Sequence, residues 1–200
     1  MGADRPADCQ QLKLFSPNLS PGRADVETGI RQMQSVERLT RSAKETFEVA
    51  RQLGEELAGG EVLALVGDLG AGKTTFTRGL VCGTGCEEYM RVNSPTYVLE
   101  QVYQGRMPVR HYDAYRLDSP YELEDLGFQE ALSTEAVLVI EWADRVESLL
   151  PADSLLLELS FASPDGNGEG PGNTRLLRFS SADGSWESRL AGLRRRADNE

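Results

Sequence analysis

The residues best suited to chemistry form one glycine-rich segment, GDLGAGKTT, at positions 67–75. It matches the phosphate-loop pattern G-x-x-x-x-G-K-[ST] at every fixed position. Glycines let the backbone bend around an anion with its amides pointing inward, and a helix starting there places its positive end under the phosphates. We therefore expect a nucleotide to be bound by Asp68, Leu69, Gly70, Ala71, Gly72, Lys73, Thr74 and Thr75.

The lysine and the first threonine of this segment have separate expected tasks. Lys73 suits the β- and γ-phosphates, and the Thr74 hydroxyl suits Mg²⁺. A second metal ligand is predicted at Glu141, which follows the apolar run 137–140. An apolar strand that ends in a carboxylate has the form of a Walker B strand, which lies beside the phosphate-loop strand. Aspartate is usual there, and the longer Glu141 can act on Mg²⁺ directly or through water.

Asp113 and Thr96 complete the predicted catalytic set with Lys73 and Glu141. Asp113 is either a carboxylate that orients or deprotonates the attacking water, or a surface acid paired with Arg116. Thr96 is either a sensor of the γ-phosphate in a switch loop or an ordinary turn residue.

Other side chains have two open interpretations each. His111, the only histidine, makes a structural hydrogen bond or transfers a proton. Arg116 is an arginine finger or pairs with the acidic run 122–125, and that run is a solvated face or a docking surface. Trp142 stacks on a ligand or packs in the core.

Alternating strand and helix patterns surround these residues and must position them. An apolar strand at 61–66 leads into the phosphate loop, and a helix follows to about Val81. A helix capped by Ser42 precedes them, and an acidic helix begins at Ser119 and ends near Gly127. Further strands are expected at 36–39, 97–103, 107–113, 136–140, 155–161 and 174–179, with a final helix at 186–196. The fold class predicted is α/β, a P-loop NTPase fold whose mostly parallel sheet is flanked by helices and carries an antiparallel hairpin insertion.

The amino-acid composition limits which partners the protein can bind and where in the cell it is expected. The chain has 200 residues with 21 basic and 32 acidic side chains, a net charge of −11, which argues against direct stable binding of nucleic acid. No apolar stretch approaches the ~18 residues of a membrane span, and no secretory signal is apparent, so we expect no membrane contact and a cytoplasmic location. We expect a disordered tail at 1–34, an ATPase domain at 35–180, and a C-terminal helix and tail at 181–200.

Five segments in a fixed order resemble one family. They are GDLGAGKTTFTRG, NSPTYVL, HYDAYRL, the helix end at 125–127, and VIEWADRV. Together they are similar to the TsaE (YjeE) family, a bacterial ATPase of tRNA threonylcarbamoyladenosine synthesis, over roughly 36–161.

This resemblance implies ATP and Mg²⁺ as cofactors, with Thr74 and Glu141 as metal ligands. It also implies that Asp113 is needed for hydrolysis, that 94–97 is a switch-like loop, and that the adenine lies near 42–46. The partner implied is the TsaB–TsaD heterodimer. ATP hydrolysis there is similar to a step that resets the complex between turnovers, and we expect it to be slow without the partner. Three rival functions stay open: a small-molecule P-loop kinase, a GTP-dependent switch, and a nucleotide-gated binding subunit without turnover. The GTP-dependent switch lacks an N-K-x-D segment after Glu141.

Overall fold

The chain forms a seven-stranded sheet with helices on both faces in a computed structural model that describes residues 34–162, 172–182 and 184–197. The expected tail at 1–34, apart from Gln34, and most of the glycine-rich segment 163–173 lie outside the described residues. No helix within these ranges is long and apolar enough to cross a membrane. The strands are β1 (Gln34–Thr40), β2 (Val62–Val66), β3 (Glu100–Gln104), β4 (Pro108–Asp113), β5 (Val137–Glu141), β6 (Leu155–Phe161) and β7 (Arg175–Ser181).

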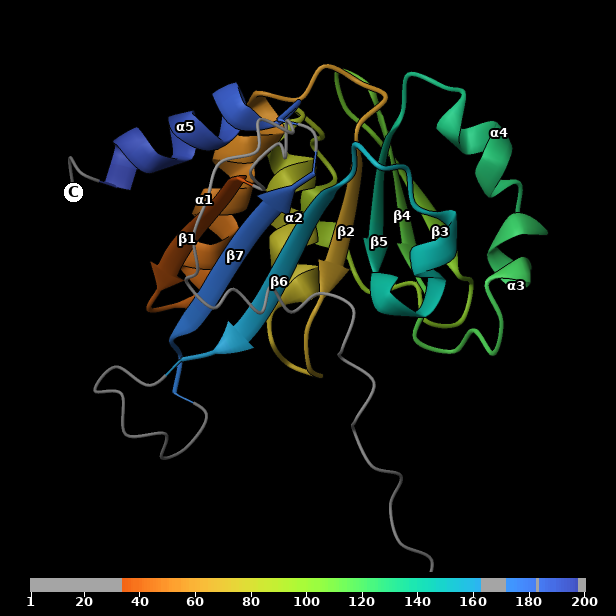
Figure 1. The fold of residues 1–200 in the computed structure, drawn as a ribbon, viewed down its shortest axis with the longest axis horizontal. Coiled ribbons are helices and arrows are strands. Elements are labelled where there is room, and N and C mark those ends of the chain that lie inside the picture. Colours follow the sequence, from red (N-terminus) through yellow and green to blue (C-terminus); the bar gives the residue numbers. More distant parts are fainter. Residues whose placement is uncertain (1–33, 163–171, 183, 198–200) are drawn as a thin grey trace, which may run out of the picture. The chain divides into compact units, whose positions relative to one another are not determined.

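The sheet has the strand order β1-β7-β6-β2-β5-β4-β3 (Figure 1). The central strands β6, β2, β5 and β4 are parallel neighbours, whereas β3 pairs with β4 and β7 with β6 in antiparallel fashion. Because β1 is antiparallel to β7, five of the seven described strands run in one direction. The predicted fold class is confirmed, including the β3–β4 hairpin.

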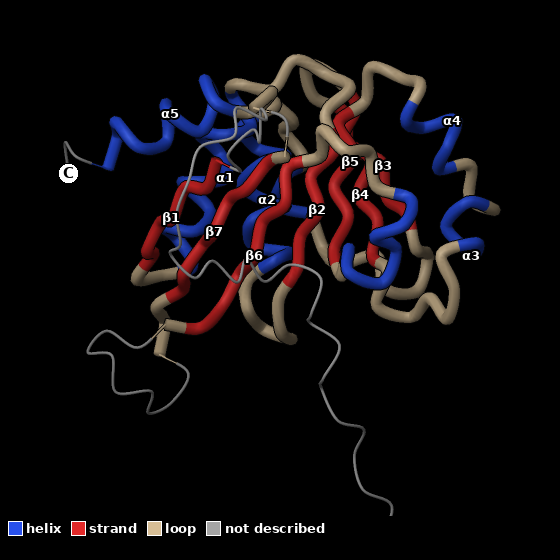
Figure 2. The backbone as a smooth tube through the Cα atoms, viewed as in Figure 1, coloured by secondary structure: helices blue, strands red, loops and turns tan. Residues whose placement is uncertain are grey.

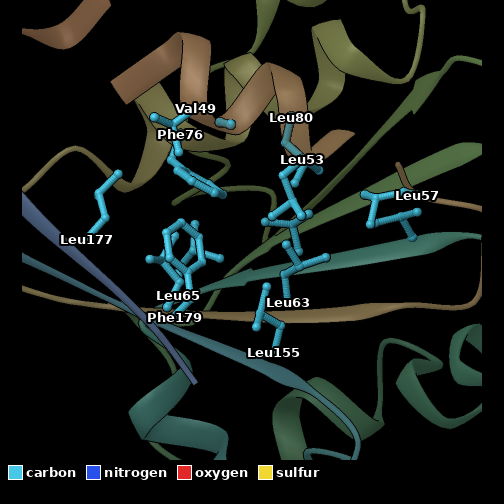
Figure 3. Close-up of a cluster of buried hydrophobic side chains, with 14 of the residues drawn as sticks. Val49, Leu53, Leu57, Leu63, Leu65, Phe76, Leu80, Leu155, Leu177 and Phe179 are labelled. Carbon is cyan, nitrogen blue, oxygen red and sulfur yellow. The ribbon is translucent and has the colours of Figure 1, made fainter. Parts of the chain in front are cut away.

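Two layers of helices cover the sheet (Figure 2). Alternate strand residues serve the two faces: Leu63 and Leu65 of β2 pack on one, while Val62 and Ala64 pack on the other. The first face is covered by α1 (Ala43–Glu55), α2 (Lys73–Gly83) and α5 (Glu187–Ala197) (Figure 3). The second face is covered by α3 (Tyr121–Glu124), α4 (Phe128–Leu132) and the 3₁₀ segment η2 (Ala143–Leu149).

Helices α1 and α2 approach each other so closely that glycine is required between them. A Cβ atom added at Gly79 would lie 2.2 Å from the Phe47 carbonyl oxygen, and one at Gly83 would lie 2.1 Å from that of Arg51. The backbones of the two helices are therefore in direct contact. Because α2 begins at the phosphate loop, this contact fixes the position of that loop relative to α1.

One expected strand differs from the structure. The strand expected from Tyr97 begins only at Glu100, because the amides of Val98 and Leu99 donate to the Pro95 carbonyl and Leu99 has a φ of 63°. A tight turn therefore replaces the first three residues of that strand. A short 3₁₀ segment, η1 (Tyr89–Arg91), precedes the turn.

The acidic helix α3 ends before Gly127, as predicted, and a second short helix that was not predicted, α4, follows it. Gly127 lies between them with a φ of 77°, which is outside the helical region. At the first helix, the Ser42 hydroxyl accepts from the Glu45 amide at 3.1 Å, as its capping pattern predicts.

Candidate functional site

The carboxyl ends of three parallel strands bring the candidate residues to one edge of the sheet. Strand β2 ends in the phosphate loop, β4 ends at Asp113, and β5 ends at Glu141. Glu141 is in register with Leu65 on one side and with Asp113 on the other. In open α/β sheets this edge is where ligands bind.

The phosphate loop depends on glycine conformations that other residues rarely adopt. Gly67, Gly70 and Gly72 have φ values of 146°, 79° and 112°. A Cβ atom at Gly67 would lie 2.2 Å from the Leu159 carbonyl oxygen, so the loop also lies against β6. Gly72 caps α2, and the Phe76 amide donates to its carbonyl at 2.9 Å. The free amides of the first helical turn thus face the space enclosed by the loop.

Lys73 is almost fully buried and is held by the loop itself. Its Nζ donates to the carbonyls of Gly67 at 2.5 Å and Asp68 at 3.0 Å, and it lies 3.7 Å from the centroid of the Trp142 ring. Burial lowers the pKa of the Lys73 ammonium, an effect opposed chiefly by the nearby Glu141 carboxylate. An anion in the loop would supply the negative charge that this buried ammonium lacks.

Glu141 and Thr74 are brought together as the sequence predicts. The Thr74 hydroxyl donates to Glu141 Oε2 at 3.1 Å, and the His111 ring Nε2 lies 2.9 Å from Glu141 Oε1. An ionised carboxylate only accepts, so Nε2 carries the proton of that contact. The Thr77 hydroxyl lies 3.5 Å from the same Oε1. A hydroxyl and a carboxylate oxygen side by side are hard ligands of the kind that Mg²⁺ prefers.

Asp113 forms a second buried cluster with the turn that precedes β3. Its Oδ2 accepts from the hydroxyls of Ser94 and Thr96, the latter at 2.9 Å, and its Oδ1 accepts from the Tyr115 amide at 2.9 Å. Ser94 and Thr96 are also within 2.8 Å of each other. Asp113 therefore holds the segment 94–97 at the edge of the sheet that carries the phosphate loop.

Of the two interpretations of Arg116, pairing with the acidic run is not seen among the described residues, and the arginine finger stays a prediction. The Arg116 guanidinium lies 4.3 Å from the Tyr97 ring centroid, and within that part of the chain it makes no ion pair with Asp113 either. Tyr97 is 84% exposed, so this pair lies on the outer surface of the turn. Trp142 is half-buried between Lys73 and Tyr115, whose ring centroid is 4.9 Å away.

The segment 42–46 lies beside the loop. The hydroxyls of Thr40 and Thr46 are 2.8 Å apart, and a Cβ atom at Gly72 would be 4.0 Å from the Thr46 methyl group. The expected adenine site near this segment stays a prediction.

Thr77 was missed from the sequence, whereas His111 was singled out there and makes a hydrogen bond with Glu141 in the structure. Thr77 follows Thr74 by three positions on α2 and thus shares its face, a signal that helical spacing supplies. His111 is two residues before Asp113 on β4, so both point to the face covered by α2. In the part of the chain described, no group of three His, Cys, Asp or Glu side chains is arranged to hold a metal ion, and Thr74 and Glu141 remain the candidate protein ligands.

The fold and the loop together define a P-loop NTPase-type α/β domain. The family model for TsaE, described as threonylcarbamoyl adenosine biosynthesis protein, matches residues 40–167. Over 131 residues, the chain is 41% identical to the tRNA threonylcarbamoyladenosine biosynthesis protein TsaE of Treponema pallidum, covering 66% of this chain and 95% of that one. Its identity to the Bacillus subtilis protein of the same name is 38% over 134 residues, or 66% of this chain and 82% of that one.

A solved structure leads to the same family. The crystal structure of Bacillus subtilis YdiB superposes with a TM-score of 0.66 at 28% identity, covering 83% of this chain and 98% of that one. The chain belongs to the TsaE family.

Proposed function

We propose that this protein is a Mg²⁺-dependent ATPase that supports tRNA threonylcarbamoyladenosine formation. The observation that carries the proposal is the 3.1 Å contact between the Thr74 hydroxyl and the Glu141 carboxylate at the mouth of the phosphate loop. Family membership supports the biosynthetic role, because the relatives carry that role in their names.

The residues present fit ATP and Mg²⁺. Three glycines with positive φ shape a cradle that Cβ atoms would disturb, and the buried Lys73 has only loop carbonyls and Trp142 as close polar or aromatic partners in the described structure. Thr74 and Glu141 would hold the metal ion. When bound there, Mg²⁺ would supply positive charge that offsets the charge developing during phosphoryl transfer.

The chain's own residues would divide the work of hydrolysis. The amides of residues 68–75 and the Lys73 ammonium bind the phosphates, and Asp113 holds Thr96 where a γ-phosphate can be detected. Water attacks the γ-phosphorus as the bond to the β-bridging oxygen breaks, and a carboxylate at the strand ends accepts the proton of that water. We expect slow intrinsic turnover, since no arginine of the described residues is seen in contact with the inner side of the loop and Arg116 stacks on Tyr97.

The partners proposed are TsaB and TsaD, in the cytoplasm. The net charge of −11 favours docking on proteins over direct stable binding of tRNA. The positive groups proposed to bind the phosphates are Lys73 and the loop amides.

The test is ATP binding and turnover by the full chain, alone and with purified TsaB, TsaD and tRNA. We expect Lys73→Ala to abolish binding, Glu141→Ala to remove the Mg²⁺ dependence of hydrolysis, and the exposed Glu147→Ala to behave as the wild type. Unchanged turnover in both site variants would refute the assignment of the site. Transfer of the γ-phosphate to an acceptor other than water would favour a kinase, and tight binding without turnover in the full mixture would favour a nucleotide-gated subunit.

A further inference from the structure

We propose that Arg175 is a positioning residue that holds the phosphate loop from its outer side. Arg175 is the first residue of β7, more than a hundred positions after the loop. Its Nε donates to the Ala71 carbonyl at 3.2 Å, and its Nη2 lies 3.4 Å from the Gly70 carbonyl oxygen. The inference rests on the proposed binding of nucleotide phosphates.

The guanidinium is itself fixed by its surroundings. Its Nη1 donates to the carbonyls of Gly172 at 2.6 Å and Thr174 at 3.0 Å. The Phe161 ring lies under it, with 4.2 Å between the guanidinium carbon and the ring centroid. Phe161 and Arg175 are register partners in β6 and β7, so the sheet sets their separation. The planar guanidinium is held by the Gly172 and Thr174 carbonyls and by the Phe161 ring. Its Nε and Nη2 donors therefore face the loop in one orientation.

These contacts determine where two peptide units of the loop point. In a trans peptide the carbonyl and the following amide point in opposite directions. Holding the Ala71 carbonyl outward therefore turns the Gly72 amide toward the inside of the loop. The Gly70 carbonyl shares its peptide with the Ala71 amide, which closes the loop turn by donating to Asp68 at 3.1 Å. The flanking Gly70 and Gly72 lack Cβ atoms and have the widest conformational freedom, so an external hold is effective there.

The contact belongs to a part of the chain beyond the family match. The TsaE model ends at residue 167, and the hairpin partner that carries Arg175 follows it. The contacts that Arg175 makes with the loop are to the Gly70 and Ala71 carbonyls, and we do not place it among the groups that contact the phosphates. We expect Arg175 to keep the loop ordered before a ligand binds, and thereby to raise its affinity for phosphates.

The experiment compares Arg175→Ala with Arg178→Ala in the full chain. Both variants remove one positive charge from β7, but Arg178 pairs with the Glu37 and Glu158 carboxylates, and within the described residues it makes no ion pair with the phosphate loop. The probes are a fluorescent ATP analogue, titrated directly, and tripolyphosphate, which competes without a nucleoside. We expect Arg175→Ala to weaken both by about tenfold or more, since hydrogen bonds from a charged donor are lost, and Arg178→Ala to leave both unchanged.

A third variant separates positioning from charge. Arg175→Lys keeps the charge but loses the planar fork, so we expect affinities between those of the wild type and the alanine variant. Thermal unfolding controls for folding, and if Arg175→Ala does not fold, wild-type affinity in Arg175→Lys overturns the inference. Equal affinities in Arg175→Ala and Arg178→Ala also overturn it, as does a loss for the ATP analogue without one for tripolyphosphate. In those cases the wild type still binds ATP and the proposed function stands, whereas a wild type that binds no ATP refutes both.

Discussion

The Lys73 ammonium lies 3.7 Å from the centroid of the Trp142 ring. Trp142 directly follows Glu141 in the chain. Trp142 has a φ of 59°, a left-handed conformation that is uncommon outside glycine, asparagine and aspartate. This turn of the backbone brings the indole over the lysine of a loop that lies about seventy residues earlier. The arrangement couples the phosphate-binding cation to the strand that carries the candidate metal ligand.

The Trp142 contact predicts an optical signal for nucleotide binding. We expect Lys73 to move from the indole face toward the phosphates on binding, and loss of a cation at 3.7 Å changes the surroundings of the ring. We expect the intrinsic tryptophan fluorescence of the full chain to change saturably on titration with ATP and Mg²⁺.

The chain contains only one other tryptophan, Trp186, which provides the control. Trp186 is buried, and its Nε1 donates to the Asp153 carbonyl at 2.8 Å. Trp142→Phe should abolish the signal and Trp186→Phe should preserve it. A signal that survives in Trp142→Phe would show that Lys73 does not leave the indole.

Burial of Lys73 predicts a pH dependence of stability. Its pKa is lowered in the folded protein relative to 10.5, so the unfolded chain binds more protons between the two values. The free energy of unfolding of the ligand-free protein should therefore rise with pH in that window, relative to Lys73→Met, which cannot titrate. Denaturant unfolding of both proteins at several values up to pH 10.5 measures the difference. Parallel pH profiles would contradict the burial effect.

The Asp113 cluster predicts a loss of turnover with little loss of affinity. Asp113→Asn keeps the size of the side chain but weakens its acceptance of the Ser94 and Thr96 hydroxyls. We expect turnover to fall by about tenfold or more, since charged hydrogen bonds are each worth ~1.5–3 kcal/mol, while the ATP dissociation constant changes less. Asp118→Asn, an exposed carboxylate outside the cluster, is the matched control. Equal turnover in the two variants would show that Asp113 has no role in hydrolysis.

Replacing glycine by alanine should have opposite effects in two helices: at Gly79, where α2 contacts α1, and at Gly192 in α5. Gly79→Ala introduces a Cβ atom 2.2 Å from the Phe47 carbonyl oxygen and should destabilise the fold by about 1–3 kcal/mol or more. Gly192→Ala, in α5, has no atom within 4 Å of its Cβ and should stabilise by roughly 0.5–1 kcal/mol. Thermal or denaturant unfolding measures both, and destabilisation by the two substitutions alike would contradict the packing described.

The sequence predicts what local chemistry determines. The phosphate loop, the capping of α1 by Ser42, and the apolar strand before Glu141 each follow from a short pattern. The continuation to Leu99 of the turn after Pro95 was missed, because an apolar residue with positive φ carries no compositional signal. Contacts between distant segments, such as Arg175 with Ala71, depend on strand order, which no local pattern encodes.

Strand β1 occupies one margin of the sheet, and among the described strands it pairs with β7 alone. Residues 34–40 therefore pair with 175–181, almost the full length of the described chain away. On the ribosome, β1 emerges long before β7 and must wait for it to pair as described. A chain shortened before residue 175 by a premature stop would leave β1 unpaired, along with the apolar residues that β7 covers, and we expect cellular proteolysis to remove such a product.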